Sequence, residues 1–337
     1  MIQKAIADVV EGRDLSTEQA AQVMNEIMSG EATPAQFGAL VTALRLKGET
    51  PDEIAGMAQV MREKSLHVDV DGPVVDTCGT GGDGSNSFNI STTAGFVVAG
   101  AGAAVAKHGN RAMSGACGSA DVLEALGVKI DLSPKGVKRC IEEVGFGFMF
   151  AQRYHPSMRV AAGPRREIGI RTVFNILGPL TNPAGARSHL LGVADATVAE
   201  KMARVLGRLG ADHALVVHGA DGLDEITLSD QTHVWEVKAG SVESYDLSPG
   251  DLGFESAPRD ALRAESVDDS TRMLRAVLES KPGPTRDVVL MNAAAALLAA
   301  DTVPSLSEGV AAATESIDTG RALDKLESLT TLSQALE

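Results

Sequence analysis

Residues 76–93 read Asp-Thr-Cys-Gly-Thr-Gly-Gly-Asp-Gly-Ser-Asn-Ser-Phe-Asn-Ile-Ser-Thr-Thr and form the most informative segment of the chain. The segment is a glycine-rich turn between a short apolar run and a helix of small residues. Backbone N–H groups in such a loop can surround a phosphate, and the start of the following helix adds its positive end. The segment therefore predicts a phosphate-binding loop.

Residues 79–84 also satisfy the dinucleotide-binding pattern G-x-G-x-x-G, which is a weak match on its own. We reject that interpretation because the position about twenty residues on, where a ribose-binding acid belongs, is occupied by Ala-Val-Ala-Lys107. A bare turn with a helix cap is the structural alternative, but one cap needs fewer polar side chains than this entrance carries. Those side chains are Ser87, Asn89, Ser91 and Thr92.

Beyond His67, short β-prone runs alternate with alanine-rich helical stretches, which predicts α/β architecture. The longest apolar stretch, Thr92 to Ala106, is too short to span a bilayer and predicts a helix packed inside a domain, so we expect no membrane insertion. The expected strands are 73–76, 215–218 and 232–237; the later helices are 121–126, 271–280 and 287–300; surface connections are expected around 248–250 and 281–284.

Upstream of the loop, three helix starts follow one another, each with a hydroxyl cap and a Glu or Gln three residues later. The pairs are Ser16 with Gln19, Thr33 with Gln36, and Thr50 with Glu53. Pro34 and Pro51 occupy the first helical position, where a missing N–H costs nothing, and Gly30 and Gly48 end helices. These signals predict a small all-helical N-terminal domain.

Composition limits the possible partners. The 337 residues carry a formal charge of −15, with 45 acidic and 30 Lys and Arg side chains, so nucleic acid and anionic membranes are not expected partners. Three cysteines, an odd number with no close pair, fit a reducing compartment. The N-terminus lacks the features of a signal peptide, and we expect a cytoplasmic protein.

The segment 107–121 combines cations, an amide and small residues, a composition that suits a diphosphate. Lys107 would act as a point charge, Asn110 as donor and acceptor, and Ser119 as a hydroxyl ligand near a helix start. Alternatively, Lys107 and Arg111 are surface charges. For His108, a packed core imidazole stays open beside a role in binding.

Two later clusters carry charged groups suited to an acidic acceptor and to a metal. The fork of Arg165 matches a carboxylate, whereas Arg166 and Arg171 could pair with acids nearby. Asp224 and Glu225 follow a strand end, and adjacent carboxylates there suit Mg²⁺, which is commonly shared with substrate phosphates. A solvated turn is the alternative for this pair.

In order and spacing, these clusters resemble the anthranilate phosphoribosyltransferase family along the whole chain, up to residues 316–320, Ser-Ile-Asp-Thr-Gly. The resemblance implies a helical domain over residues 1–70, completed by about 165–185. It implies an α/β domain over 71–164 and 186–337 with a central, mainly parallel sheet flanked by helices. A homodimer through the helical domains, Mg²⁺ dependence and the second step of tryptophan synthesis are also implied.

Carried over residue by residue, the family pattern implies contacts to phosphoribosyl pyrophosphate (PRPP) from Gly79, Gly82, Asp83, Ser87, Asn89, Ile90, Ser91, Thr92, Lys107, His108, Gly109, Asn110, Arg111, Ala112, Met113, Ser114, Gly115 and Ser119. The implied metal ligands are Ser91, Asp224 and Glu225. Anthranilate would contact Gly79, Asn110 and Arg165, with His108, His155 and Met158 near its ring. Catalytic roles fall to Lys107, Arg165, Asp224 and Glu225.

The chain departs from the family pattern at two positions. Ser87 stands where Thr is more usual and keeps the hydroxyl, whereas Gly115 stands where a second Ser is common and loses a side-chain donor. A pyrimidine nucleoside phosphorylase shares the Lys-x-x-Asn-Arg and Ser-Gly-rich features, but the acid pair and the glycine-rich loop favour the transferase. A nucleic-acid-binding relative would need a basic stripe, which the acidic balance argues against.

Overall fold

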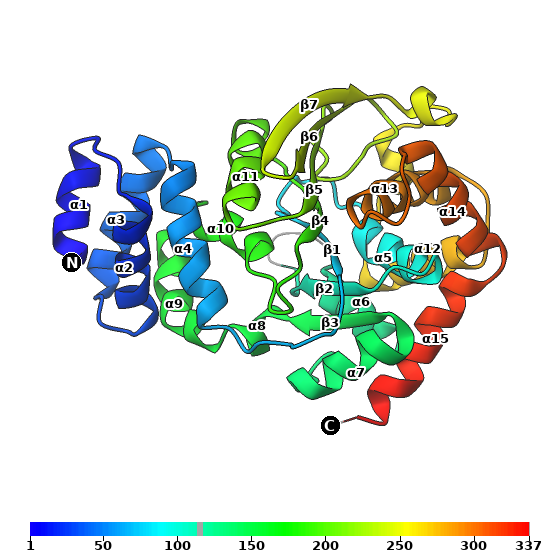
Figure 1. Ribbon diagram of the computed structural model, residues 1–337, viewed down its shortest axis with the longest axis horizontal. Helices are drawn as coiled ribbons and strands as arrows, with labels where there is room; N and C mark the ends of the chain where they lie inside the picture. Colours follow the sequence, from blue (N-terminus) through cyan, green and yellow to red (C-terminus); the bar gives the residue numbers. More distant parts are fainter. Residues whose placement is uncertain (113–116, 337) are drawn as a thin grey trace.

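The computed structural model describes residues 1–112 and 117–336, in which four helices lead into a larger α/β part (Figure 1). The three expected capping boxes are confirmed. In each, the cap side chain accepts a hydrogen bond from the third helical N–H, and the Gln or Glu side chain accepts one from the backbone N–H of the cap residue. The first helix lacks a side-chain cap, which is why the cap pattern did not reveal it. These helices are α1 (Ile2–Val10), α2 (Thr17–Met28), α3 (Pro34–Lys47) and α4 (Pro51–Glu63).

The helical part is completed by a later segment. Helix α9 (Arg159–Ile168) contacts α2 and α3, and α10 (Phe174–Leu177) contacts α4. The rings of Phe37 and Phe174 lie 5.1 Å apart. The same hydrophobic cluster continues through α11 (Ala196–Arg208) to one face of the sheet, so apolar packing joins both parts. The domain boundaries themselves stay a prediction.

Seven strands form one sheet in the order β3-β2-β1-β4-β5-β6-β7. The pairs from β3 to β5 are parallel, and β6 and β7 add antiparallel pairs, which confirms the mainly parallel sheet. Because the chain builds outward from β1 in one direction and then adds β4 on its other side, a switch point lies between β1 and β4. The strands are β1 (Val75–Gly79), β2 (Val105–Gly109), β3 (Phe146–Phe150), β4 (Ser188–Gly192), β5 (His213–Gly219), β6 (Thr232–Lys238) and β7 (Ser241–Leu247).

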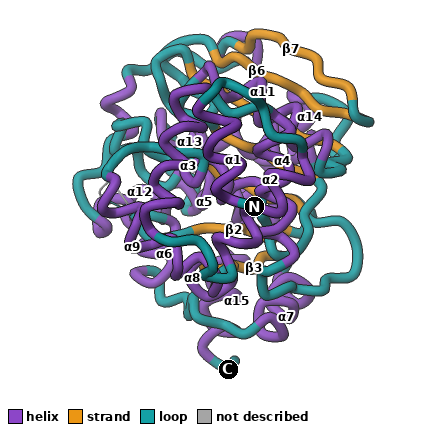
Figure 2. The backbone as a smooth tube through the Cα atoms, turned by 90° about the vertical axis from the view of Figure 1, so that its left-hand side faces the viewer, coloured by secondary structure: helices purple, strands orange, loops and turns teal. Residues whose placement is uncertain are grey.

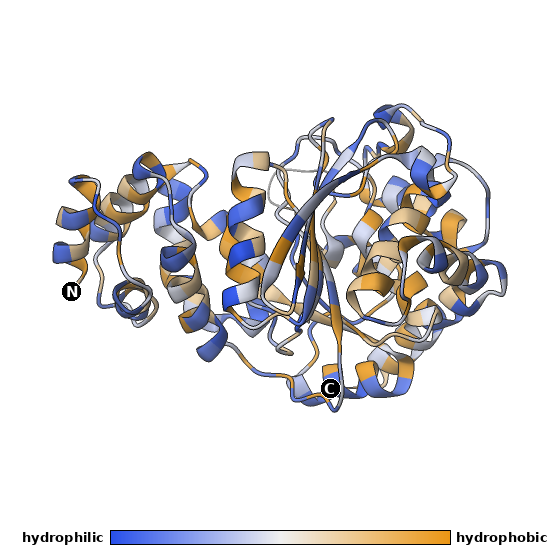
Figure 3. Ribbon diagram, turned by 45° about the horizontal axis from the view of Figure 1, so that its top comes forward, coloured by the Kyte–Doolittle hydropathy of each residue, from blue (hydrophilic) through white to orange (hydrophobic). Residues whose placement is uncertain are grey.

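Helices cover both faces of the sheet. Figure 1 shows α11 and the helical part on one side of the sheet and the remaining large helices on the other, and Figure 2 shows the molecule from the end that carries the helical part. Hydrophobic and hydrophilic residues occupy different sides of many helices (Figure 3), and the buried hydrophobic residues form the core. The remaining α-helices are α5 (Ile90–Gly100), α6 (Ser119–Ala125), α7 (Pro134–Val144), α8 (Ala151–Tyr154), α12 (Val267–Leu278), α13 (Pro284–Ala299), α14 (Leu306–Asp318) and α15 (Arg321–Gln334).

Most later elements lie where the sequence predicts them, but the apolar stretch 92–106 is not one helix. Helix α5 ends at Gly100, and β2 begins at Val105. Gly102 between them has φ +104°, which turns the chain back into the sheet. Strand β1 begins two residues later than expected and ends at the first glycine of the loop.

The two expected surface connections contain some regular structure. A short 3-10 helix (Pro249–Leu252) occupies the first, and Pro284 opens α13 at the end of the second. Other 3-10 turns are Pro156–Met158, Gly178–Leu180 and Arg259–Leu262. Among the helices in the described part of the chain, none combines the length and apolar character needed to cross a membrane.

Candidate functional site

The predicted site lies at the carboxyl edge of the sheet, beside the switch point where ligands of open α/β folds bind. The glycine-rich loop follows β1, the segment with the cations continues from β2, and the acid pair follows β5. Three stretches far apart in the sequence therefore converge because their strands are parallel neighbours or near neighbours.

The conformation of the glycine-rich loop requires its glycines. Gly81, Gly82 and Gly84 have φ values of +66°, +74° and +68°, a region that L side chains rarely adopt. At Gly79, a Cβ atom would lie 2.5 Å from Asp224 Oδ2, so a side chain there would collide with the acid. The loop is thus shaped both by backbone geometry and by close contact with the segment after β5.

The acid pair is bound to the loop and to the start of α5. Asp224 Oδ2 accepts a hydrogen bond from the Gly81 N–H at 2.7 Å, and Glu225 Oε1 accepts from the Ser91 N–H at 3.2 Å. Glu225 is only 8% exposed, so the alternative of a solvated turn is wrong for it. The structure brings the three predicted metal ligands together.

The electrostatics of the pair favour a cation. Burial, followed by the neighbouring Asp83 carboxylate, raises the pKa of Asp224 to about 7. Burial, followed by Asp224, raises the pKa of Glu225 to about 8, and only Lys107 among nearby charges opposes the rise. Two neighbouring carboxylates that are shielded from water are destabilised as anions unless a cation lies beside them.

Lys107 is buried, with 2% of its surface exposed, which contradicts the surface-charge alternative. Its ammonium donates to the Thr77 carbonyl oxygen and, at 3.3 Å, to the Ser91 hydroxyl. Burial lowers its pKa, while Asp76 and Glu225 act in the opposite direction. Lys107 thus holds a positive charge between the end of β1 and the start of α5.

Asp76 lies in a hydrogen-bond network next to this arrangement. Its carboxylate accepts from the His108 N–H at 3.2 Å and from the Asn182 amide at 2.7 Å, and that amide also donates to the Ala106 carbonyl. Burial raises the pKa of Asp76 to about 6. The network joins β1 and β2 to the segment after α10.

The start of α5 is also fixed by its surroundings. The Asn89 amide donates to Ser270 Oγ at 3.1 Å and to the Cys117 carbonyl at 3.3 Å. Thr92 is fully buried and Ile90 nearly so. Ser87 lies in a short antiparallel bridge with Arg263. The polar entrance predicted from the sequence therefore meets α12 and the segment before it.

The segment after β2 follows the prediction only in part. Ser119 Oγ donates to the Asn110 carbonyl at 3.3 Å, and a Cβ at Gly109 would lie 2.2 Å from that hydroxyl. Arg111 pairs with Asp121 at 3.0 Å and also with Glu124, as the surface-charge alternative expects. Ala112 N–H donates to the same Asp121 carboxylate. The expected contacts of Met113, Ser114 and Gly115 lie outside the described residues.

Arg165 projects from the helical part. Its guanidinium lies 5.6 Å from the centre of the Phe174 ring, and burial lowers its pKa. Within the described residues it forms no ion pair and no hydrogen bond to another predicted site residue. It is therefore a partly buried cation without an acid partner, as a site for a substrate carboxylate requires.

The two histidines expected near the acceptor ring do lie together. The rings of His108 and His155 have centres 5.0 Å apart, and both are buried. Burial lowers the pKa of His108 to about 3 and that of His155 to about 4, so both are neutral. Nε2 of His108 and both ring nitrogens of His155 have no hydrogen-bond partner among the described residues. Met158 ends the 3-10 turn that follows His155.

Three positioning contacts were not foreseen. Arg171 donates to the carbonyls of Gly82 and Gly81, at 3.0 and 3.1 Å. Among the described residues neither Arg171 nor Arg166 forms a close ion pair, although the pKa of Asp195 is lowered by the Thr197 hydroxyl and also by the charge of Arg171. Arg259 donates to the carbonyls of Asp221 and Asp83. Nothing in the local sequence of either arginine indicates these partners.

The third unforeseen residue is Asn292. Its amide accepts from Ile226 N–H and donates to Ile226 C=O, both at 3.0 Å, directly beside the acid pair. It is fully buried in α13. A lone amide within the apolar run 288–299 is the signal that could have revealed it.

The site has the donor set expected for a metal shared with a substrate. The described residues hold no group of three or more His, Cys, Asp or Glu side chains that could hold a metal alone. However, Asp83 Oδ2 is buried without a hydrogen bond, and the nearby acids have raised pKa values. Magnesium prefers oxygen and commonly takes one or two carboxylates with substrate phosphates, so these residues fit it.

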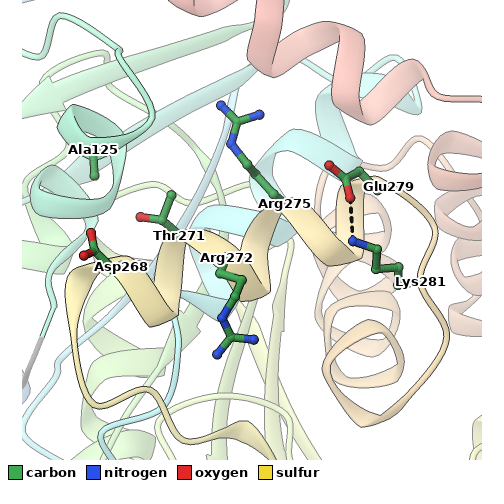
Figure 4. Close-up of a pocket in the computed structure, with 7 residues that line it drawn as sticks. All are labelled: Ala125, Asp268, Thr271, Arg272, Arg275, Glu279 and Lys281. Atoms are coloured by element: carbon green, nitrogen blue, oxygen red, sulfur yellow. Dashed lines mark hydrogen bonds and ion pairs between the residues drawn. The ribbon is translucent and has the colours of Figure 1, made fainter.

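A hollow of about 340 Å³ lies elsewhere, along the outer side of α12 (Figure 4). None of its lining residues belongs to the predicted site. They are Ala125, Asp268, Thr271, Arg272, Arg275, Glu279 and Lys281.

Comparison with known proteins gives a consistent result. Residues 3–65 match the glycosyl transferase family helical bundle domain, and residues 71–323 match the glycosyl transferase family a/b domain. The chain is 61% identical to the anthranilate phosphoribosyltransferase of Chloroflexus aurantiacus over 335 residues, which cover 99% of both chains.

Solved structures agree in fold. The anthranilate phosphoribosyltransferase (TrpD) of Thermus thermophilus is 44% identical, with a TM-score of 0.92 over 98% of this chain and 99% of that one. The Saccharomyces cerevisiae enzyme in complex with PRPP and Mg is 27% identical, with a TM-score of 0.91 over 99% and 98% of the two chains.

Proposed function

Because the chain belongs to the anthranilate phosphoribosyltransferase family, we propose that the carboxyl edge of its sheet carries out the reaction of that family. The phosphoribosyl group of PRPP passes to the amine of anthranilate, giving N-(5-phosphoribosyl)anthranilate and pyrophosphate in the synthesis of tryptophan. One observation carries the assignment of the site: the half-buried Asp224 and the buried Glu225 accept hydrogen bonds from the glycine-rich loop and from the start of α5.

The donor binds across the glycine-rich loop, the start of α5 and the end of β2. Backbone N–H groups of the loop and the N-terminus of α5 favour the diphosphate, and Lys107 adds a positive charge. Ser91, Asp224 and Glu225 would hold Mg²⁺. When bound, the ion offsets the negative charge that develops on the departing pyrophosphate.

The acceptor needs orientation rather than activation. The aryl amine of anthranilate is neutral near pH 7 and already nucleophilic, so no strong base is required. Arg165 binds its carboxylate, Gly79 and Asn110 line the path toward the sugar, and the neutral rings of His108 and His155 face the aromatic ring. Proximity then supplies much of the rate, since C1 of the sugar and the amine are held together.

The difficult step is the departure of pyrophosphate from an oxocarbenium-like centre. Lys107 and the N–H groups of the loop stabilise charge in the transition state because they are already oriented. A pyrimidine nucleoside phosphorylase would use phosphate as nucleophile and leaves the acid pair unexplained. We also propose a cytoplasmic homodimer that contacts through the helical parts.

The first test mixes purified protein with PRPP, Mg²⁺ and anthranilate and follows anthranilate fluorescence with and without EDTA. Metal-dependent loss of the signal is the expected result. No loss, with PRPP still binding by calorimetry, would remove anthranilate as the acceptor and leave the donor site in place.

A further inference from the structure

Arg171 makes an unusual contact for an arginine at the molecular surface. It lies between α9 and α10, and its guanidinium donates through Nη1 to the carbonyl of Gly82 and through Nη2 to that of Gly81. Two nitrogens of one planar group thus bind two consecutive carbonyls, a geometry that a lysine ammonium cannot reproduce. The contact fixes the orientation of two successive peptide groups in the glycine-rich loop.

The loop is shaped to receive this guanidinium. A Cβ atom on Gly82 would lie 2.2 Å from Arg171 Nη1, so the arginine occupies the space of a missing side chain. The carbonyls of Gly81 and Gly82 point to Arg171, whereas the Gly81 N–H points to Asp224 Oδ2 at 2.7 Å. The loop is therefore bound by an arginine at two of its carbonyls and by Asp224 at one of its N–H groups.

The same short segment carries the acceptor group. Arg165 lies six positions before Arg171, and its guanidinium covers the ring of Phe174, three positions after Arg171. Phe174 in turn packs on Phe37 of the helical part. A shift of this segment is transmitted to the glycine-rich loop through Arg171, because the two bonds leave little freedom between them.

We propose that Arg171 is a positioning residue that couples the acceptor segment, residues 165–174, to the donor loop, residues 79–84. It holds the loop in the conformation that binds PRPP, and occupation of the acceptor site strengthens donor binding through it. The inference rests on the proposed function, since it takes the two sites to hold anthranilate and PRPP. Arg171 contacts the loop and need not touch either substrate.

The test measures dissociation constants of Mg-PRPP by calorimetry, so its readout is independent of turnover. The proteins are the wild type, Arg171→Ala, Arg171→Lys and the control Arg166→Ala, which removes an exposed arginine of the same segment. Each is titrated alone and with saturating benzoate, which has the carboxylate of anthranilate and lacks the reactive amine. Arg171→Gln, which keeps a polar side chain but cannot bind two carbonyls through one planar cation, is a second variant if Arg171→Ala does not fold.

Loss of two hydrogen bonds to the loop is expected to weaken donor binding about tenfold in Arg171→Ala. Arg171→Lys is expected to lose nearly as much, and Arg166→Ala to bind like the wild type. Benzoate is expected to tighten donor binding in the wild type and in Arg166→Ala, but not in Arg171→Ala.

Three results would overturn the inference. Wild-type affinity in Arg171→Lys would mean that only the charge matters, equal losses in Arg166→Ala would make the effect nonspecific, and benzoate coupling that is absent from the wild type or persists in Arg171→Ala would disprove the link. Failure of the proposed function is seen separately, as absence of anthranilate turnover by a wild type that still binds Mg-PRPP.

Discussion

Two buried glutamates, one in the helical part and one at the carboxyl edge of the sheet, show how differently the two regions use charge. Glu53 is fully buried and accepts from the N–H groups of Leu15 and Thr50 and from the ammonium of Lys47 at 3.0 Å. Glu225 is nearly as buried but accepts only from Ser91 among hydrogen bonds to the described residues, beside a second acid. Glu53 therefore has a full set of partners within the fold, whereas Glu225 lacks such a set among the described residues and is suited to bind a cation.

The two glutamates illustrate the difference between a buried acid that stabilises the fold and one that contributes to ligand binding. A buried acid with a full set of partners stabilises the structure around it, and its loss leaves donors unsatisfied. A buried acid with too few partners costs stability in the free protein and supplies binding energy to a ligand instead. The predictions that follow test this division.

The largest effect is expected at the acid pair. Replacing Asp224 and Glu225 by their amides should lower turnover by at least about a hundredfold at limiting metal, because the charge that holds Mg²⁺ is lost. The Mg²⁺ dependence of activity should move to higher concentration. An unchanged Mg²⁺ titration would remove both residues from the metal site.

The same double amide variant should also change how stability depends on pH. The pKa values of Asp224 and Glu225 in the folded protein, about 7 and about 8, lie above their ordinary values, so the folded state binds protons more tightly than the unfolded state. Their contribution to stability is therefore present at low pH and is lost as pH rises through the folded pKa values.

In EDTA, we expect the wild type to lose stability relative to the double amide variant between about pH 4 and pH 8, at roughly 1.4 kcal/mol per unit of pKa difference. Urea unfolding at several pH values measures the difference. Parallel curves for the two proteins would show that these carboxylates keep ordinary pKa values.

The matching change in the helical part is Glu53→Gln. In either orientation the NH2 group of the glutamine would face a donor, the Leu15 N–H at the Oε1 position or Lys47 and the Thr50 N–H at the Oε2 position. We therefore expect a loss of about 2 kcal/mol of unfolding free energy. Activity per folded molecule should remain that of the wild type. If this variant instead lost activity without losing stability, the contrast between the two glutamates would fail.

Arg165→Ala tests the helical part as a source of substrate contacts. Loss of a charge-assisted bond to the acceptor carboxylate should raise the KM for anthranilate about tenfold and leave the KM for PRPP nearly unchanged. Steady-state kinetics with each substrate varied in turn measure both constants. A parallel rise in both, or a drop in thermal stability, would indicate a structural arginine.

The helical part could be foreseen in detail because its signals are local. Each capping box joins residues three positions apart, so sequence and structure agree at Ser16, Thr33 and Thr50. The uncapped first helix was missed for the same reason. The glycine-rich loop could also be recognised from the sequence, because the positive φ values of Gly81, Gly82 and Gly84 favour glycine.

The sequence predicted which residue types form the site but not which of them contact one another. The bond between Gly81 and Asp224 joins residues 143 positions apart, and no local pattern encodes it. The contact of Arg171 with the loop was not foreseen because an exposed arginine can bind backbone carbonyls as well as carboxylates. Asn292 left a trace in the sequence, as a polar residue in an apolar run, but not its partner.

The sequence by itself therefore determined the capped helices, the glycine-rich loop, the acid pair and the family to which they point, since these depend on residue type and short spacing. The tertiary structure alone decided that Glu225 and Lys107 are buried, that Arg111 pairs with surface acids and that Arg171 binds the loop. The physical reason is the parallel sheet: its strand order brings the ends of distant segments to one edge, and burial there depends on what packs around them.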